Sequence, residues 1–168
     1  MSDASQTAIE PEHPTETRLR VRDARVGDMS EVEAIDARIT GINKPEYWAR
    51  AFARYGARAD RWFLVAEAEG RLVGFIIGEQ RAWEFGSPPC GWVFAIGVDP
   101  GLRLGGIGTR LFAAITRRMQ AAGVALVRTM LARDDALNMA FFRSQGMMGG
   151  SFLQLEMPLD DIADEDTP

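Results

Sequence analysis

The sequence predicts a single domain of the α/β (α+β) class. The chain has 168 residues, of which 46% are hydrophobic, so it is long enough for one substantial core and short for two. Its apolar residues switch repeatedly between the two-residue period of strands and the 3.6-residue period of helices. The expected domain spans residues 18–158. It lies between a polar segment, 1–17, and an acidic segment, 159–168, both expected to be flexible tails.

The expected elements follow the order β, α, α, β, β, β, α, β, α, β. Strands are predicted where apolar residues alternate or run continuously between turn signals: residues 18–25, 62–67, 72–78, 91–98, 124–131 and 152–159. Helices are predicted where apolar residues recur at helical spacing: residues 28–39, 46–55, 105–122 and 136–144. Glu69 and Gly70 are typical of a tight turn that joins the second and third strands as a hairpin.

The net charge of −5 comes from the two predicted tails. They hold nine acidic residues and no Lys or Arg, which leaves 15 acids and 19 bases in between. A mildly basic body favours an anionic small ligand over nucleic acid, for which a basic stripe would be expected.

The composition also excludes several kinds of site and segment. A single cysteine, Cys90, rules out an internal disulfide and a cysteine-based zinc site, and the single histidine, His13, lies in the predicted tail, so no metal is expected. No apolar run is long enough for a membrane span, and the N-terminal residues do not resemble a signal peptide. A cytoplasmic protein is therefore expected.

The segment 96–109 is the one most informative about chemistry. A predicted buried strand ends, a short loop follows, and Gly105, Gly106 and Gly108 open an amphipathic helix. Backbone N–H groups at such a helix N-terminus suit a phosphate, and Arg103 adds a charged donor. A P-loop is excluded because Ile107 stands where lysine is required, and a Rossmann fingerprint is excluded by the bulky Leu111. Glycines that serve only close packing at a helix start remain the alternative.

Two motifs in this chain resemble those of the GNAT superfamily of N-acetyltransferases. Arg103-x-x-Gly106-x-Gly108, after a strand that ends Val98-Asp99-Pro100, is similar to the family's coenzyme A pyrophosphate loop. Residues 141–147, Phe-Phe-Arg-Ser-Gln-Gly-Met, resemble its later helix with an aromatic pair. The resemblance covers nearly all of 18–158. It implies a mixed, mostly antiparallel sheet of six to seven strands, flanked by four helices, whose central strands splay apart.

The resemblance further implies that acetyl-coenzyme A is the acetyl donor. Backbone amides of residues 104–109 would hold its pyrophosphate, and the strand residues before them would hold the pantetheine arm. The implied donor-binding residues are Ile96, Gly97, Val98, Arg103, Leu104, Gly105, Gly106, Ile107, Gly108, Thr109, Asp135 and Phe142. Asp135 has an alternative role as a helix cap.

Acetyl transfer needs a neutral amine, although a free alkylamine, with a pKa of about 10, is mostly protonated at neutral pH. Glu79 is the candidate base, and a solvated strand-end carboxylate is the alternative for it. Where the family usually has a tyrosine acid, this chain has Phe142, which has no hydroxyl. A leaving thiol with a pKa of about 8.5 can still depart as thiolate.

Aromatic and acidic residues mark the expected acceptor site. Tyr47 and Trp48 follow the first helix, and Trp83 and Glu84 precede the fourth strand. They suit a cationic amine through cation–π contact, or they pack on one another or at a homodimer interface. The sequence therefore predicts acetyl transfer to an amine of a small molecule or a protein. A catalytically weak acetyl-coenzyme A sensor or assembly module is the alternative.

Overall fold

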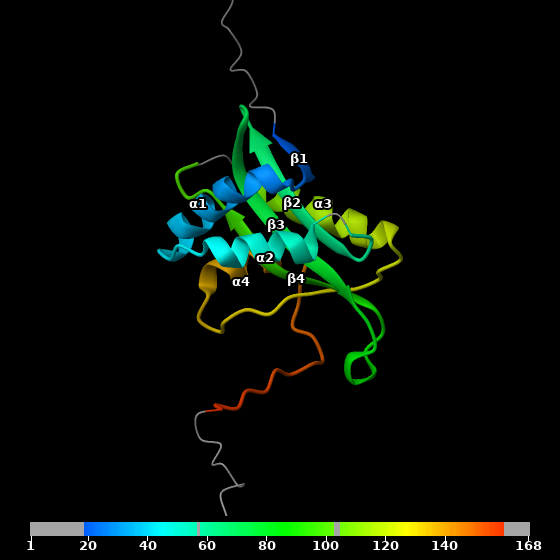
Figure 1. Ribbon diagram of the computed structural model, residues 1–168. Coiled ribbons are helices and arrows are strands. Elements are labelled where there is room, and N and C mark those ends of the chain that lie inside the picture. The colour runs from blue at the N-terminus through cyan, green and yellow to red at the C-terminus, as the bar shows by residue number, and fades with distance from the viewer. Residues whose placement is uncertain (1–18, 57, 103–104, 160–168) are drawn as a thin grey trace, which may run out of the picture. The chain divides into compact units, whose positions relative to one another are not determined.

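Figure 1 shows the protein as a computed structural model, which describes residues 19–56, 58–102 and 105–159. The chain divides into two units, Met1–Met130 and Leu131–Pro168, and each is described by itself. That residues 18–158 form one domain stays a prediction, and the segments 1–17 and 160–168 lie outside the described residues.

The first unit is built on a five-stranded sheet whose strands lie side by side in chain order. The strands are β1 (Arg20–Asp23), β2 (Arg61–Ala68), β3 (Arg71–Arg81), β4 (Cys90–Val98) and β5 (Val127–Arg128). The first four strands pair antiparallel, and β5 runs parallel to β4. The turn between β2 and β3 is the predicted hairpin, because Glu69 and Gly70 both have positive φ, 53° and 75°.

Two helices, α1 (Met29–Thr40) and α2 (Pro45–Tyr55), cover one face of this sheet (Figure 1). The short helix η1 (Val26–Asp28) leads into α1, and η2 (Glu84–Gly86) lies in the β3–β4 connection. The core on this face joins buried side chains of both helices to those of the central strands: Val32, Ile35, Trp48, Phe63, Val65, Phe75 and Ile77. This face is therefore closed by helix packing over β2 and β3.

The helix α3 (Ile107–Ala121) packs on the opposite face. It lies close to the sheet because β3 and β4 present glycines toward it. A Cβ built at Gly78 would lie 2.7 Å from Cε of Met119, and one at Gly91 would lie 2.5 Å from Sδ of the same residue. The apolar spacing that predicts this helix supplies its buried side: Ile107, Leu111, Phe112, Ile115 and Met119.

The second unit contains the helix α4 (Ala136–Ser144), whose bounds are those predicted from the sequence. The predicted strand at 152–159 is wrong, because these residues form no strand and are exposed. The predicted strand at 124–131 is longer than the observed strand β5, which has two residues. The described residues thus hold four α-helices, as expected, but five strands instead of six to seven. Alternating apolar residues indicate strand propensity, yet a strand also needs a neighbour whose backbone it can pair with.

Within the part of the chain that the structure describes, no helix has the length and apolar character needed to cross a membrane.

Candidate functional site

The parallel strands β4 and β5 pair only at their N-terminal ends. Gly91 pairs with Val127 and Trp92 with Arg128, and the described residues contain no β5 partner for 93–98. Next to this point β4 has a bulge, since Ala95 pairs with Ile77 and Val93 with Gly78, which leaves Phe94 without a partner on β3. A bulge bends its strand and increases its twist, and this bulge lies next to the point where the pairing of β4 with β5 ends. That the central strands splay apart stays a prediction.

The open edge of β4 carries backbone groups that the sheet does not use. The N–H of Asp99 donates to the carbonyl of Val73 at 2.9 Å, so it points toward β3. Because N–H groups alternate between the two edges of a strand, those of Ile96 and Val98 point to the open edge. Gly97 lies between them, and a Cβ there would lie 2.6 Å from Cε1 of Phe75, so close packing on the core requires glycine at this position.

The α3 helix begins beyond the C-terminal end of β4. Its N-cap is Gly106, with φ +86°, and its first intrahelical bond runs from the N–H of Arg110 to the carbonyl of Gly106 at 2.9 Å. The N–H groups of Ile107 and Gly108 precede that bond and point beyond the helix end. The first turn holds no acidic residue, so the positive end of the helix dipole is not offset there.

Packing within the chain does not explain the glycine at position 105. A Cβ built at Gly105 or Gly106 meets no heavy atom of the described residues within 4 Å. The left-handed backbone conformation at position 106 requires a glycine. Position 105 has no such requirement, and the space beside its Cα is open. The alternative that the glycines serve close packing is thus not supported at Gly105. The predicted ligands Arg103 and Leu104 lie outside the described residues.

Asp99 fixes the connection between β4 and α3, a role that the sequence analysis missed. Its Oδ2 accepts a hydrogen bond from Nη2 of Arg38 on α1 at 2.9 Å, and its Oδ1 accepts one from the N–H of Gly101 at 3.0 Å. The signal was present in Asp99-Pro100-Gly101, where an aspartate at the start of a turn bonds the backbone two residues on. The partner on α1 had no comparable signal.

Glu79 belongs to a row of side chains that crosses four strands. The register places Arg61 (β2) opposite Glu79 (β3), Glu79 opposite Trp92 (β4), and Trp92 opposite Arg128 (β5). Directly opposite residues share a face of the sheet, and the contact of Arg61 with the carbonyl of Arg54 at 3.0 Å shows that this is the face of α2. We call Arg61, Glu79, Trp92 and Arg128 the cross-strand row.

The carboxylate of Glu79 is held by arginines on both sides. Arg81, two residues further along β3, donates from Nε to Oε1 at 2.9 Å, and Nε of Arg61 lies 3.8 Å from Oε2. Glu79 is only 7% exposed, so the alternative of a solvated strand-end carboxylate is wrong. The guanidinium group of Arg81 also stacks over the ring of Trp92, 4.6 Å from its centroid.

The predicted acceptor residues fall into two different environments. Trp48 is buried, with its ring centroid 4.9 Å from that of Phe75, while Tyr47 packs edge-on against Trp48 and is 42% exposed. Trp83 and Glu84 are both exposed in the β3–β4 connection. The burial of Trp48 favours the packing alternative for that residue, and its contact with an acceptor stays a prediction.

In the second unit, Asp135 is the N-cap of α4. Its carboxylate accepts hydrogen bonds from Nδ2 of Asn138 at 2.7 Å and from the backbone N–H of Asn138 at 3.0 Å. These bonds, the side-chain bond first, lower the pKa of Asp135. Phe142 is buried, and its ring centroid lies 5.1 Å from that of Phe141. The donor-binding roles of Asp135 and Phe142 stay predictions.

The profile of the acetyltransferase (GNAT) family matches residues 29–147. The chain therefore belongs to the acetyltransferase (GNAT) family.

Two curated proteins illustrate the relationship in sequence. A mycothiol acetyltransferase of Saccharomonospora viridis is 36% identical over 91 residues, which are 52% of this chain and 30% of that protein. The L-2,4-diaminobutyric acid acetyltransferase of Nocardia farcinica is 29% identical over 185 aligned positions, covering 100% of this chain and 90% of that protein. The chain thus matches less than a third of the first relative and nearly the whole of the second.

Solved structures of the same fold include the aminoglycoside N-acetyltransferase AAC(6')-Iy in complex with CoA. It superposes with a TM-score of 0.76 at 15% identity and covers 88% of this chain and 99% of that one. The aminoglycoside 6'-N-acetyltransferase AAC(6')-IG of Acinetobacter haemolyticus has a TM-score of 0.70 at 15% identity, with 84% and 99% covered. At this identity the likeness establishes the fold.

Proposed function

We propose that this chain transfers the acetyl group of acetyl-coenzyme A to an amine by direct attack. The observation that carries the proposal is that one strand, β4, has an open edge and leads into a helix N-terminus without an acidic residue. The first feature suits the amides of a pantetheine arm and the second suits a pyrophosphate. Family membership supports the same conclusion, and the acetyltransferases among its relatives disfavour a sensor that only binds the donor.

The proposed donor-binding groups follow β4 into α3. The backbone of Ile96 and Val98 would bond the pantetheine arm along the open edge. The N–H groups of residues 105–109, together with Arg103 and Leu104, would hold the pyrophosphate. Open space at Gly105 and the unopposed dipole of α3 fit an anionic group at this place.

An ammonium acceptor loses two protons on becoming an amide, one before attack and one as the C–N bond forms, and the C–S bond of the donor breaks. The neutral amine nitrogen attacks the thioester carbonyl carbon, the coenzyme leaves as thiolate, and the second proton passes to this thiolate or to water. Glu79 is the proposed base, acting through water at Oε2, because Oε1 already accepts the bond from Arg81. Phe142 supplies no proton, and a thiol with a pKa of about 8.5 leaves without an acid.

The proposed acceptor is a small molecule with a primary amine. The relative that matches the whole chain is named for L-2,4-diaminobutyric acid, so a short diamino acid is the first acceptor to test. The exposed side chains of Tyr47, Trp83 and Glu84 are proposed to face the acceptor, since aromatic rings and a carboxylate attract an ammonium group. The homodimer, the cytoplasmic location and the independence from metal stay predictions.

The test measures release of free thiol from acetyl-coenzyme A with a panel of amines. The panel holds 2,4-diaminobutyrate, ornithine, lysine, 1,4-diaminobutane and an aminoglycoside, and the thiol released without acceptor is subtracted. We expect turnover with at least one amine and a product heavier by one acetyl group. Binding of the donor by calorimetry without turnover of any amine would contradict an enzyme and favour a binding module.

A further inference from the structure

We infer that Arg61 and Arg81, which flank Glu79, bind a carboxylate of the acceptor, so that the acceptor is an amine that also carries a carboxylate, as an amino acid does. This inference rests on the proposed acetyltransferase function and names its substrate class. It uses side chains that the donor site does not need.

Positive charge exceeds negative charge around Glu79. Two guanidinium groups, those of Arg61 and Arg81, form ion pairs with this one carboxylate. The side chains of the two arginines are only 25% and 34% exposed, so water and salt screen their charge incompletely. Within the described residues neither arginine forms an ion pair with another carboxylate. A second carboxylate, brought by a ligand, would balance the pair of guanidinium groups.

The guanidinium group of Arg81 is held by two contacts. Its Nε donates to Glu79 at 2.9 Å, and its guanidinium carbon lies over the ring of Trp92, 4.6 Å from the centroid. These contacts restrain the guanidinium group and leave both Nη atoms without a hydrogen-bond partner among the described residues. Two Nη groups in one plane match the two oxygens of a carboxylate, and a group held in advance loses little freedom when it binds.

Arg61 is fixed in a similar way. Its Nη1 donates to the carbonyl of Arg54 at the end of α2, and its guanidinium carbon lies 5.8 Å from the ring centroid of Tyr55. The ring of Tyr55 in turn lies 4.7 Å from that of Phe94, the bulge residue of β4. Arg61 is therefore connected, through the ring of Tyr55, to the bulge of β4 at Phe94.

Arg81 lies near the point along β4 at which the open edge begins. Trp92, on which Arg81 stacks, is the last residue of β4 that pairs with β5, and the open edge begins at the next residue. A donor whose pyrophosphate lies at the start of α3 would extend back along this edge, so its thioester end would approach Trp92. An acceptor held by Arg81 through its carboxylate would then have its amine beside the thioester.

The test compares acceptors that differ at the carboxylate. 2,4-Diaminobutyrate, ornithine and lysine are each assayed beside their own carboxamides, which have the same carbon skeleton and no negative charge. We expect kcat/KM to be about tenfold or more higher for the amino acids, as is usual for hydrogen bonds between charged groups. The carboxylate-free amines, 1,4-diaminobutane and an aminoglycoside, report separately on acetyl transfer.

The variant Arg81→Gln removes the proposed carboxylate ligand. We expect it to bring the amino acid to carboxamide ratio close to one, mainly through a higher KM for the amino acids. Arg117→Gln, at an exposed arginine of α3, removes the same charge elsewhere and should keep the wild-type ratio. If Arg81→Gln does not fold, Arg81→Lys, which keeps the charge and loses the planar pair of donors, should give an intermediate ratio.

Each outcome decides between the two proposals. Equal use of amino acids and carboxamides by the wild type, a preference that survives Arg81→Gln or Arg81→Lys unchanged, or turnover of the carboxylate-free amines alone would overturn the carboxylate site and leave the enzyme standing. Absence of turnover with every amine would overturn the acetyltransferase function itself, and the carboxylate site with it.

Discussion

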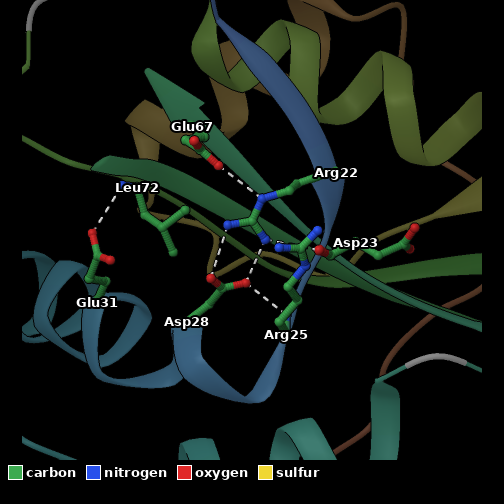
Figure 2. A network of polar contacts seen from close by, with 7 residues as sticks. All are labelled: Arg22, Asp23, Arg25, Asp28, Glu31, Glu67 and Leu72. Atoms are coloured by element: carbon green, nitrogen blue, oxygen red, sulfur yellow. Dashed lines mark hydrogen bonds and ion pairs between the residues drawn. The ribbon is translucent and has the colours of Figure 1, made fainter. Parts of the chain in front are cut away.

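Arg22 on β1 donates two parallel hydrogen bonds to the carboxylate of Asp28, from Nη1 to Oδ2 at 2.7 Å and from Nη2 to Oδ1 at 3.0 Å (Figure 2). The Oδ2 atom also accepts the backbone N–H of Arg25 at 2.7 Å, and Nε of Arg22 donates to Glu67 on β2 at 2.9 Å. These bonds, first among them the side-chain bond from Arg22, hold the pKa of Asp28 below its usual value. One carboxylate thus fixes how β1 leads into η1 and α1.

Replacing Asp28 with asparagine should destabilise the protein. The side chains of Arg22 and Asp28 are 15% and 11% exposed, so the change takes the negative charge and one of two acceptor oxygens from a poorly solvated guanidinium group. We expect Asp28→Asn to lower the free energy of unfolding at pH 7 by about 2–3 kcal/mol. Urea unfolding followed by circular dichroism measures it.

The size of this loss should depend on pH. Because the pKa of Asp28 is lowered in the folded protein, its contribution is complete above the unfolded value of about 3.9 and disappears as the pH falls through the lower folded value. The difference between wild type and Asp28→Asn should therefore shrink below about pH 4. Glu67→Gln is the control, with a loss below about 1 kcal/mol, since the side chain of Glu67 is 32% exposed. An equal Asp28→Asn loss at pH 7 and pH 3 would show that charge is not the cause.

The hydrogen bond between Trp48 and Asp36 should stabilise the folded protein. The Oδ2 of buried Asp36 accepts a hydrogen bond from Nε1 of Trp48 at 3.1 Å and forms an ion pair with Nζ of Lys44 at 2.8 Å. Asp36→Ala leaves the indole N–H buried without its acceptor, at a cost of about 1–3 kcal/mol, and Trp48→Phe removes that donor. In a double-mutant cycle the two changes should therefore be less than additive.

The same variants test the prediction that Trp48 contacts the acceptor. If the indole serves only the core, Trp48→Phe lowers the free energy of unfolding and leaves KM for the acceptor unchanged. Tyr47→Leu, at the exposed neighbour, should leave the free energy of unfolding unchanged and raise KM for the acceptor. A raised KM in Trp48→Phe at unchanged stability would place the indole in the acceptor site.

The elements that the sequence predicts best are those whose signal is local. The cap at Asp135 and the helical spacing after it define α4 to the residue, and Glu69 and Gly70 define the hairpin. The pairing of β4 with β5 ends at Trp92, beside a bulge at Phe94, and the apolar run of β4 does not reveal this bulge. Bulges depend on the partner strand, so a single strand's sequence does not determine them.

The cross-strand row shows what sequence reasoning could not reach. The sequence identifies Glu79 as the candidate base, but Arg61 and Trp92 become its neighbours only through the registers of β2–β3 and β3–β4. A shift of one residue in either pairing would move a partner to the other face. The basic surroundings of Glu79 therefore follow from tertiary structure, whereas the glycines of the α3 turn could be recognised from their order alone.

Gly105→Val should weaken donor binding without disturbing the fold. The side chain would enter open space, because a Cβ at Gly105 meets no heavy atom within 4 Å in the part of the chain that the structure describes. It would occupy the approach to the N-terminus of α3. We expect the dissociation constant for coenzyme A, measured by calorimetry, to rise about tenfold or more, which is the loss of about 1.4 kcal/mol.

Gly27→Val is the matched control, since Gly27 has equally open surroundings and lies in η1, before α1. It should leave coenzyme A affinity unchanged, and both variants should unfold at the wild-type urea midpoint. Undiminished affinity in a folded Gly105→Val protein would argue against a pyrophosphate at this turn.

Glu79→Gln should separate proton removal from positioning. If Glu79 takes the proton of the amine, the variant loses about a hundredfold in kcat/KM for every acceptor, with or without a carboxylate. If Glu79 only holds Arg61 and Arg81 in place, the loss falls on KM for acceptors that carry a carboxylate. Asp60→Asn, at the exposed acid just before Arg61, controls for the loss of a nearby negative charge and should keep both kcat and KM. We expect the first result, and an unchanged kcat/KM for carboxylate-free amines in Glu79→Gln would refute Glu79 as the base.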